Sequence, residues 1–377
     1  MSARGYVQKT VRLFSQPVIL FYALPWLMIL LIAGTLAQKH LGLYAATQQY
    51  LTAPFFWVGG IVPLPGVPVV LGIILVNLLF KLFFKSPWTP QNAGIIITHF
   101  GAAFLFLGMM LTAFFSDEGY ISLAEGERAA AVNDYYLREF TVLKNENPVY
   151  AISYDDLYPG KKIHDDTLPF AVEILDLCRN CTMAMQEEEA GDSIPRHGLA
   201  QQVRLIPAPL EKTEETNLAG AMLRITGADQ EQDGIHISFE PLQNPPQITD
   251  GEESYTILMR RIQTGLPFFI ELVDVVRTSY PGTQMPQSYH SDVIVYDGDV
   301  SWQTRIEMNA PLRYKGYTFY QSGYTLHDGQ EFTTLAVVKN AGRAFPYIAG
   351  LFLSLGMAVH AVLRIRTKKS GGQDRAF

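Results

Sequence analysis

The chain has 377 residues, of which 48% are hydrophobic and 17% are charged, and its formal net charge at neutral pH is −7. These averages conceal a segregation, because long apolar runs lie near both ends and most acidic residues lie between them. The acidic excess argues against nucleic acid as a partner. The sequence also shows no glycine-rich phosphate loop, no serine nucleophile elbow and no recognisable set of catalytic residues.

Four apolar runs are long enough to cross a hydrocarbon core of about 30 Å as helices, at about 1.5 Å per residue. They are residues 17–36, 67–84, 93–115 and 345–365. We expect the first to be a retained anchor, since its apolar stretch exceeds that of a cleaved signal peptide. The predicted fold class is an integral membrane α+β protein with three N-terminal helices in residues 1–116, an inserted domain at 117–343, and a fourth helix with a basic tail at 344–377.

Basic residues flank these spans unevenly. If the chain crosses the membrane four times, ten of them fall on the side of the two termini: Arg4, Lys9, Arg12, Lys81, Lys85, Arg364, Arg366, Lys368, Lys369 and Arg375. The segment 116–343 carries 35 acidic and 18 basic residues, a net charge of −17. The positive-inside rule therefore predicts cytoplasmic termini and an extracytoplasmic acidic domain.

The inserted domain is predicted to be β-rich and sandwich-like or an open barrel, because runs of β-forming residues recur at short spacing between turns. A two-residue hairpin is expected at Asp297-Gly298, and another at Asp328-Gly329. Residues 187–215 are polar, contain three prolines and are expected to form a long surface loop. Residues 38–66, with Phe55, Phe56 and Trp57, are expected to form an interfacial loop at headgroup level.

The third span, residues 93–115, has no formally charged residue and one ionisable side chain, His99. An imidazole in hydrocarbon favours a functional role, although a neutral histidine hydrogen-bonded to a neighbouring helix is a close alternative. Gly94, Gly101 and Gly108 recur every seven residues on one helix face, where another helix or a flat ligand could approach closely.

A second histidine, His360, lies four residues before Arg364 in the last span. His99 and His360 are both expected in the cytoplasmic part of the membrane, where two imidazoles could ligate a b-type haem. One of them could instead belong to a partner's site. A hydrated His360 near the helix end is the favoured interpretation of that residue.

The two cysteines, Cys178 and Cys181, lie in the predicted extracytoplasmic domain. A local disulfide is favoured in an oxidising compartment, with thiol exchange as the minority interpretation. A c-type haem attachment site is excluded because residue 182 is threonine, and His197 alone is weak support for zinc.

The residues 308–324 read MNAPLRYKGYTFYQSGY. This stretch resembles the signature near the end of the external domain of the ResB/CcsB family, the smaller membrane subunit of System II cytochrome c maturation. The resemblance extends over nearly the whole chain, in the order of helices and domain and in several short motifs: Gly34-Thr35-Leu36, Asn77, Thr98-His99-Phe100-Gly101 and Asp117–Gly126.

The resemblance implies a bacterial cytoplasmic-membrane protein that works with a CcsA/ResC-type partner, apocytochrome c and thiol-reducing proteins. Within the family the third-helix histidine is a haem ligand, which matches His99, and the second ligand is expected from the partner. The cofactor is then haem b, bound or transported, and the chain is at most half of a holocytochrome c synthase. The Cys178–Cys181 pair and Ala37-Gln38, where Pro-Gln is expected, depart from the family pattern and leave a divergent paralogue open.

Three other hypotheses remain at this stage. The chain could be a thiol-redox protein that uses Cys178 and Cys181, a structural scaffold without a cofactor, or a b-type electron carrier that uses His99 with His360.

Overall fold

The computed structural model describes residues 3–186, 194–228 and 231–373. The chain forms two compact units. The first comprises Met1–Asp117, Tyr314–Tyr317 and Val338–Phe377, and the second comprises Glu118–Arg313 and Thr318–Val337. We refer to them as the membrane unit and the β unit.

The membrane unit contains the four predicted spans. By length and composition the helices able to cross a membrane are Val18–Leu41, Val67–Lys85, Pro90–Phe115 and Phe345–Ile365. They correspond to α2 (Val18–Leu41), α4 (Val67–Phe80) with its extension η2 (Lys81–Lys85), α5 (Ala93–Phe115) after η3 (Pro90–Asn92), and α6 (Phe345–Gln373). The chain is a multi-pass membrane protein, and the predicted membrane α+β fold class is confirmed.

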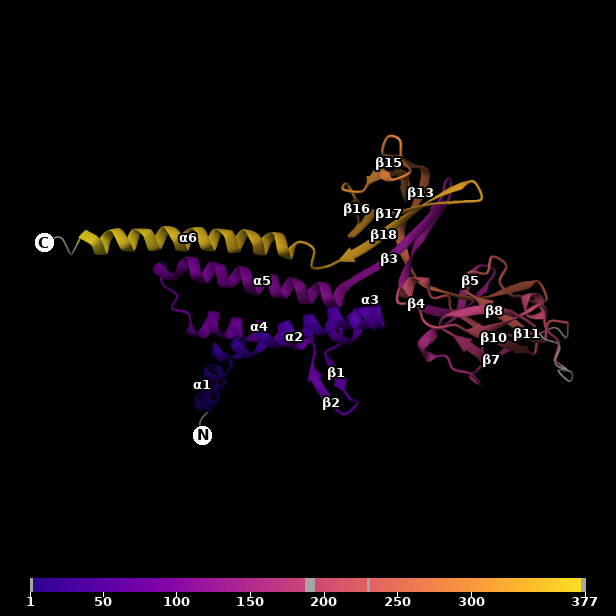
Figure 1. Cartoon of the computed structure of the whole chain (residues 1–377), viewed down its shortest axis with the longest axis horizontal. Coiled ribbons are helices and arrows are strands. Elements are labelled where there is room, and N and C mark those ends of the chain that lie inside the picture. Colours follow the sequence, from indigo (N-terminus) through magenta and orange to yellow (C-terminus); the bar gives the residue numbers. More distant parts are fainter. Residues whose placement is uncertain (1–2, 187–193, 229–230, 374–377) are drawn as a thin grey trace. The chain divides into compact units, whose positions relative to one another are not determined.

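Helices α5 and α6 lie side by side (Figure 1) and approach each other closely at the heptad-spaced glycines of α5. A Cβ atom at Gly94 would overlap the backbone of His360, and one at Gly108 would overlap the side chain of Phe345. At Gly101 it would lie 2.9 Å from the amide nitrogen of Leu353. The glycine face of α5 is therefore filled by another helix.

Residues 38–66 are more ordered than the expected interfacial loop. Helix α2 continues to Leu41, and α3 (Leu43–Ala46), η1 (Thr47–Thr52) and a hairpin of β1 (Phe55–Val58) and β2 (Val62–Pro65) follow. Positive φ angles at Gly59 and Gly60 permit the hairpin turn. Phe56 is buried against Leu30, Val70 and Ile74, so only Phe55 and Trp57 of the expected interfacial aromatic residues are exposed.

The β unit is built on two antiparallel sheets. The strands of the first run in the order β11-β10-β7-β6 (Gly234–Phe239, Gly220–Thr226, Ala171–Cys178, Lys162–Ile163). The second sheet runs β15-β14-β13-β4-β3-β18-β17-β16, with β12 on β13 and β5 on β4. Its strands in chain order are β3 (Ser116–Ala124), β4 (Arg128–Lys144), β5 (Asn147–Ser153), β12 (Gln247–Asp250), β13 (Glu253–Ser279), β14 (Pro286–Asp297), β15 (Val300–Glu307), β16 (Leu312–Tyr314), β17 (Tyr317–His327) and β18 (Gln330–Asn340).

The main core of the β unit lies between strands of both sheets. Alternating residues of β4, β7, β10 and β13 point into it and are fully buried, among them Phe140, Val142, Ile174, Leu223 and Ile257. Period-two burial of this kind is what packs two sheet faces together, and it matches the sandwich-like expectation.

A buried ionic network joins the two sheets beside this core. Arg138 of β4 and Arg261 of β13 lie directly opposite each other in the strand register, and both are nearly inaccessible. Glu240 separates the two like charges, because its Oε2 accepts from Arg138 at 2.9 Å and its Oε1 accepts from Arg261. Arg138 also donates to Glu214 Oε1 at 3.0 Å and to the carbonyl of Asn217. The network thus satisfies two charges that would otherwise oppose folding.

The local sequence predicted the two hairpin turns correctly but predicted the polar segment 187–215 only in part. Gly298 adopts a positive φ in the β14–β15 hairpin, and Asp328 and Gly329 both do so between β17 and β18. The expected surface loop at 187–215 is wrong for its second half, because β9 (Val203–Pro207) pairs with β8 (Cys181–Met185) and short 3-10 turns flank it at Gly198–Gln201 and Glu214–Thr216. Residues 187–193 lie outside the described part of the chain.

Candidate functional site

The imidazole of His99 is held within helix α5 by a hydrogen bond to its own helix. Its Nδ1 lies 2.7 Å from the carbonyl oxygen of Ile95, one turn earlier. A carbonyl only accepts, so Nδ1 donates the proton of this hydrogen bond, and the bond does not engage Nε2. A histidine that donates one ring nitrogen to a carbonyl and presents the other is prepared to ligate a metal.

His99 lies on a different face of α5 from the glycines. It precedes Phe106 by seven residues, two helical turns, so the two side chains share a face. Phe106 packs against the cluster of Leu30, Phe56, Val70 and Ile74 from α2, β1 and α4. The side chain of the half-buried His99 therefore lies on the face of α5 that faces α2 and α4.

His360 meets α5 elsewhere. Its backbone and Cβ pack onto Gly94, which is five residues from His99 and therefore about 140° around the helix at 100° per residue. His99 thus extends from one face of α5, whereas His360 of α6 packs against another face of that helix. The structure gives no support to a His99–His360 pair on one ring.

Cys178 and Cys181 form a disulfide with a Cα–Cα distance of 5.4 Å at the turn from β7 to β8. Both residues are buried, at 7% and 5% exposure, and pack with Leu205, Ile237 and Phe239. Thiol exchange requires a nucleophile to reach a sulfur atom. The burial of this disulfide favours a structural role.

His197 has a partner other than the cysteines. Its ring stacks on His236 with centroids 5.0 Å apart, and its Nε2 donates to the carbonyl of Asp233 at 3.1 Å. Burial lowers the pKa of His236 below its ordinary value of 6.5, and the neighbouring His197 adds to the effect. This stacked pair fixes the segment around residue 197 to β11 and was not anticipated from the sequence.

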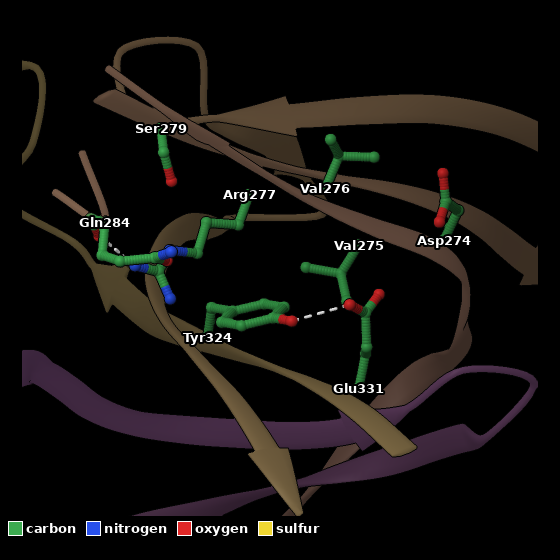
Figure 2. Close-up of a pocket in the computed structure, with 8 residues that line it drawn as sticks. All are labelled: Asp274, Val275, Val276, Arg277, Ser279, Gln284, Tyr324 and Glu331. Carbon is green, nitrogen blue, oxygen red and sulfur yellow. Dashed lines mark hydrogen bonds between the residues drawn. The ribbon is translucent and has the colours of Figure 1, made fainter. Parts of the chain in front are cut away.

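A polar pocket of about 330 Å³ opens in the β unit where β13, β17 and β18 meet (Figure 2). Tyr324 donates to Glu331 Oε1 at 2.6 Å, and this hydrogen bond raises the pKa of Tyr324. Across the pocket Arg277 donates to the carbonyl of Gln284. One carboxylate oxygen from each of Glu125, Asp274 and Glu331 lies within 4.8 Å of the other two.

The sequence pointed to only one part of this pocket, the motif that ends at Tyr324. Tyr324 closes the motif 308–324, which forms β16 and the first part of β17. Glu331 follows Tyr324 across the short β17–β18 turn, but Asp274 belongs to β13, and no local pattern connects it with Tyr324. They meet only through the pairing of the large sheet.

Comparison with known proteins finds a family similarity in part of the chain. Residues 246–349 match the model of the ResB-like family. Protein NrfI of Wolinella succinogenes is 32% identical over 94 residues, which are 24% of this chain and 10% of NrfI. The chain thus matches about a tenth of the length of this relative.

The ResB-like match covers β12 to β18 and the first residues of α6. It includes the motif 308–324, which supports the resemblance found in the sequence. His99, the disulfide and His197 lie outside the matched residues. Their roles therefore rest on the geometry given above.

Proposed function

We propose that this chain is a subunit of a cytochrome c biogenesis system and that His99 holds haem within the membrane unit. The match to the ResB-like family supports the biogenesis role. The observation that carries the haem assignment is the hydrogen bond from His99 Nδ1 to Ile95, which leaves Nε2 as the ligand atom.

The surroundings of His99 fit a haem. The face of α5 that carries it is apolar, with Ala103 and Phe106 in the following two turns, and haem packs well among apolar helices. When bound, haem would supply an iron whose axial position accepts an imidazole. The contribution of this chain is to fix the tautomer and orientation of His99 and to keep the ligand atom away from water.

The second axial ligand comes from a CcsA/ResC-type membrane partner in this proposal. Within the described residues, His360 of α6 packs against the Gly94 face of α5, away from the face that carries His99. The acidic β unit lies outside a bacterial cytoplasmic membrane, where it meets apocytochrome c, and both termini are cytoplasmic. This orientation follows from the distribution of basic residues. Other proteins keep the apocytochrome thiols reduced, since the buried disulfide here is poorly placed for exchange.

A scaffold without its own cofactor is the second candidate. The glycine-mediated contact between α5 and α6 favours it, because it shows that the heptad glycines serve helix packing and leave no space for a flat ligand on that face. The two candidates differ in what they require of His99.

Reconstitution of cytochrome c maturation distinguishes them. The full chain, a CcsA/ResC-type partner and apocytochrome c are expressed in a host without its own maturation system, and covalent haem on the cytochrome is measured. We expect His99→Ala to abolish maturation and added imidazole to restore part of it, whereas His360→Ala matures normally. Normal maturation by His99→Ala at equal protein level would favour the scaffold.

A further inference from the structure

Helix α1 (Ala3–Phe14) gives one end of the membrane unit an unusual charge. The first 116 residues contain no aspartate or glutamate. Within α1, Lys9 and Arg12 lie three residues apart on one face and are exposed, and Val11 and Phe14 lie three apart on the opposite face. The helix is amphipathic, and its basic face meets no acidic residue of its own segment.

A buried amide fixes where α1 leaves the bundle. Asn77 of α4 is 1% exposed and donates both amide hydrogens, to the carbonyl of Phe14 at 2.6 Å and to that of Gln16 at 2.9 Å. These carbonyls lie at the break between α1 and α2 beside Pro17, where the carbonyl of Gln16 also accepts from the backbone N–H of Ile19 at 3.3 Å. Asn77 therefore stabilises the bend at which α1 changes direction relative to α2 (Figure 1).

The apolar face of α1 points to α4. The rings of Phe14 and Phe80 lie 5.4 Å apart, and those of Phe80 and Phe84 lie 5.5 Å apart. Val11 is half-buried. With its apolar face turned to the bundle, the helix presents Lys9 and Arg12 outward.

The end of α4 continues the same surface. In η2 and the turn after it, Phe84, Lys85 and Trp88 are exposed, and Trp88 is oriented by donating Nε1 to the carbonyl of Leu82 at 3.1 Å. Exposed aromatic rings next to lysine are typical of the level of lipid headgroups. We call residues 8–14 and 83–88 together the basic platform.

We propose that the basic platform binds anionic phospholipid headgroups. Its exposed lysine and arginine side chains complement a phosphate-rich surface, and its exposed aromatic rings suit the boundary between headgroups and acyl chains. Charge complementarity selects this occupant, since a protein partner would need an acidic surface at membrane level. Basic residues that served only to orient the chain in the membrane would explain the number of lysines and arginines. They would require neither the bend that Asn77 fixes nor the outward orientation of Lys9 and Arg12.

The test uses the full chain in nanodiscs made from mixed phosphatidylglycerol and phosphatidylcholine, with native mass spectrometry of the lipids retained on the released protein. The triple variant Lys9→Gln, Arg12→Gln, Lys85→Gln removes the charges of the platform. The control variant Lys39→Gln, Lys162→Gln, Lys212→Gln removes three exposed charges elsewhere.

We expect the wild type to retain phosphatidylglycerol in preference to phosphatidylcholine. The preference should fall about five-fold for each basic residue removed from the platform, and it should persist in the control variant. In the wild type, high salt should weaken it, which tests the inference without a variant. Equal retention of the two lipids by the wild type would overturn the proposal. The proposal would also be overturned if the platform variant kept the lipid preference of the wild type but lost a protein that co-purifies with the wild type.

Discussion

The buried ionic network of the β unit offers a sharp test of how that unit is held together. Glu240 lies between Arg138 and Arg261, which oppose each other across β4 and β13, so Glu240→Gln leaves two buried guanidinium groups facing each other. Removing one partner of a buried ion pair costs about 3–5 kcal/mol. The amide keeps the volume of the carboxylate, so loss of the charge accounts for the effect.

Hydrogen exchange measured by mass spectrometry on the full chain reports this loss locally. Peptides from β4 and β13 that exchange through opening of the β unit should do so roughly a hundred-fold to a few thousand-fold faster in Glu240→Gln. Asp292→Asn is the matched control, because Asp292 pairs with the half-exposed Arg305 at 2.7 Å. An exposed pair contributes about 0–1 kcal/mol, so that variant should change exchange by less than about ten-fold. Equal effects of the two variants would refute the reasoning.

Three further predictions concern other parts of the chain. Gly94→Val should separate α5 from α6 and lower the thermal stability of the membrane unit, whereas Gly350→Ala, which meets open space, should not; equal melting temperatures would contradict the close contact. Because burial lowers the pKa of His236, its unfolded form binds a proton more readily, so the stability of the β unit should fall as the pH decreases below about 6.5 and His236→Gln should flatten this dependence in denaturant titrations. The double variant Cys178→Ser, Cys181→Ser should lose about 2 kcal/mol from opening of a four-residue loop yet support cytochrome c maturation, and failed maturation by a folded variant would restore the thiol-exchange hypothesis.

The membrane helices could be predicted because uniform apolarity over about 20 residues has one structural solution in a bilayer. Their ends were less certain. Helix α2 continues through Ala37 and Gln38 to Leu41, since small and polar residues remain helical when no proline or glycine intervenes.

The β unit was predicted unevenly. Strands with alternating apolar residues, such as β10 and β14, agree with the expected runs of β-forming residues between turns. The long β4 was not, because Arg128–Lys144 mixes polar and apolar residues and owes its extended form to pairing with β13 more than 100 residues later.

The residues of the candidate site could also be predicted only in part. His99 could be identified from the sequence as the single ionisable residue of its span. Its hydrogen bond to Ile95 could not, because that bond depends on the side-chain conformation of His99. The relation between His99 and His360 depends on which faces of α5 and α6 meet, which follows from Gly94 and cannot be read from the depth of each residue. The pocket around Tyr324 depends on sheet order, a long-range property.

The visible absorption spectrum of the full chain, purified from membranes with and without a CcsA/ResC-type partner, tests the central claim most directly. We predict a haem Soret band in the wild type with its partner, its loss in His99→Ala, its partial return with added imidazole, and an unchanged band in His360→Ala. An undiminished band in His99→Ala, or no band in the wild type with its partner present, would contradict the assignment of His99 as a haem ligand.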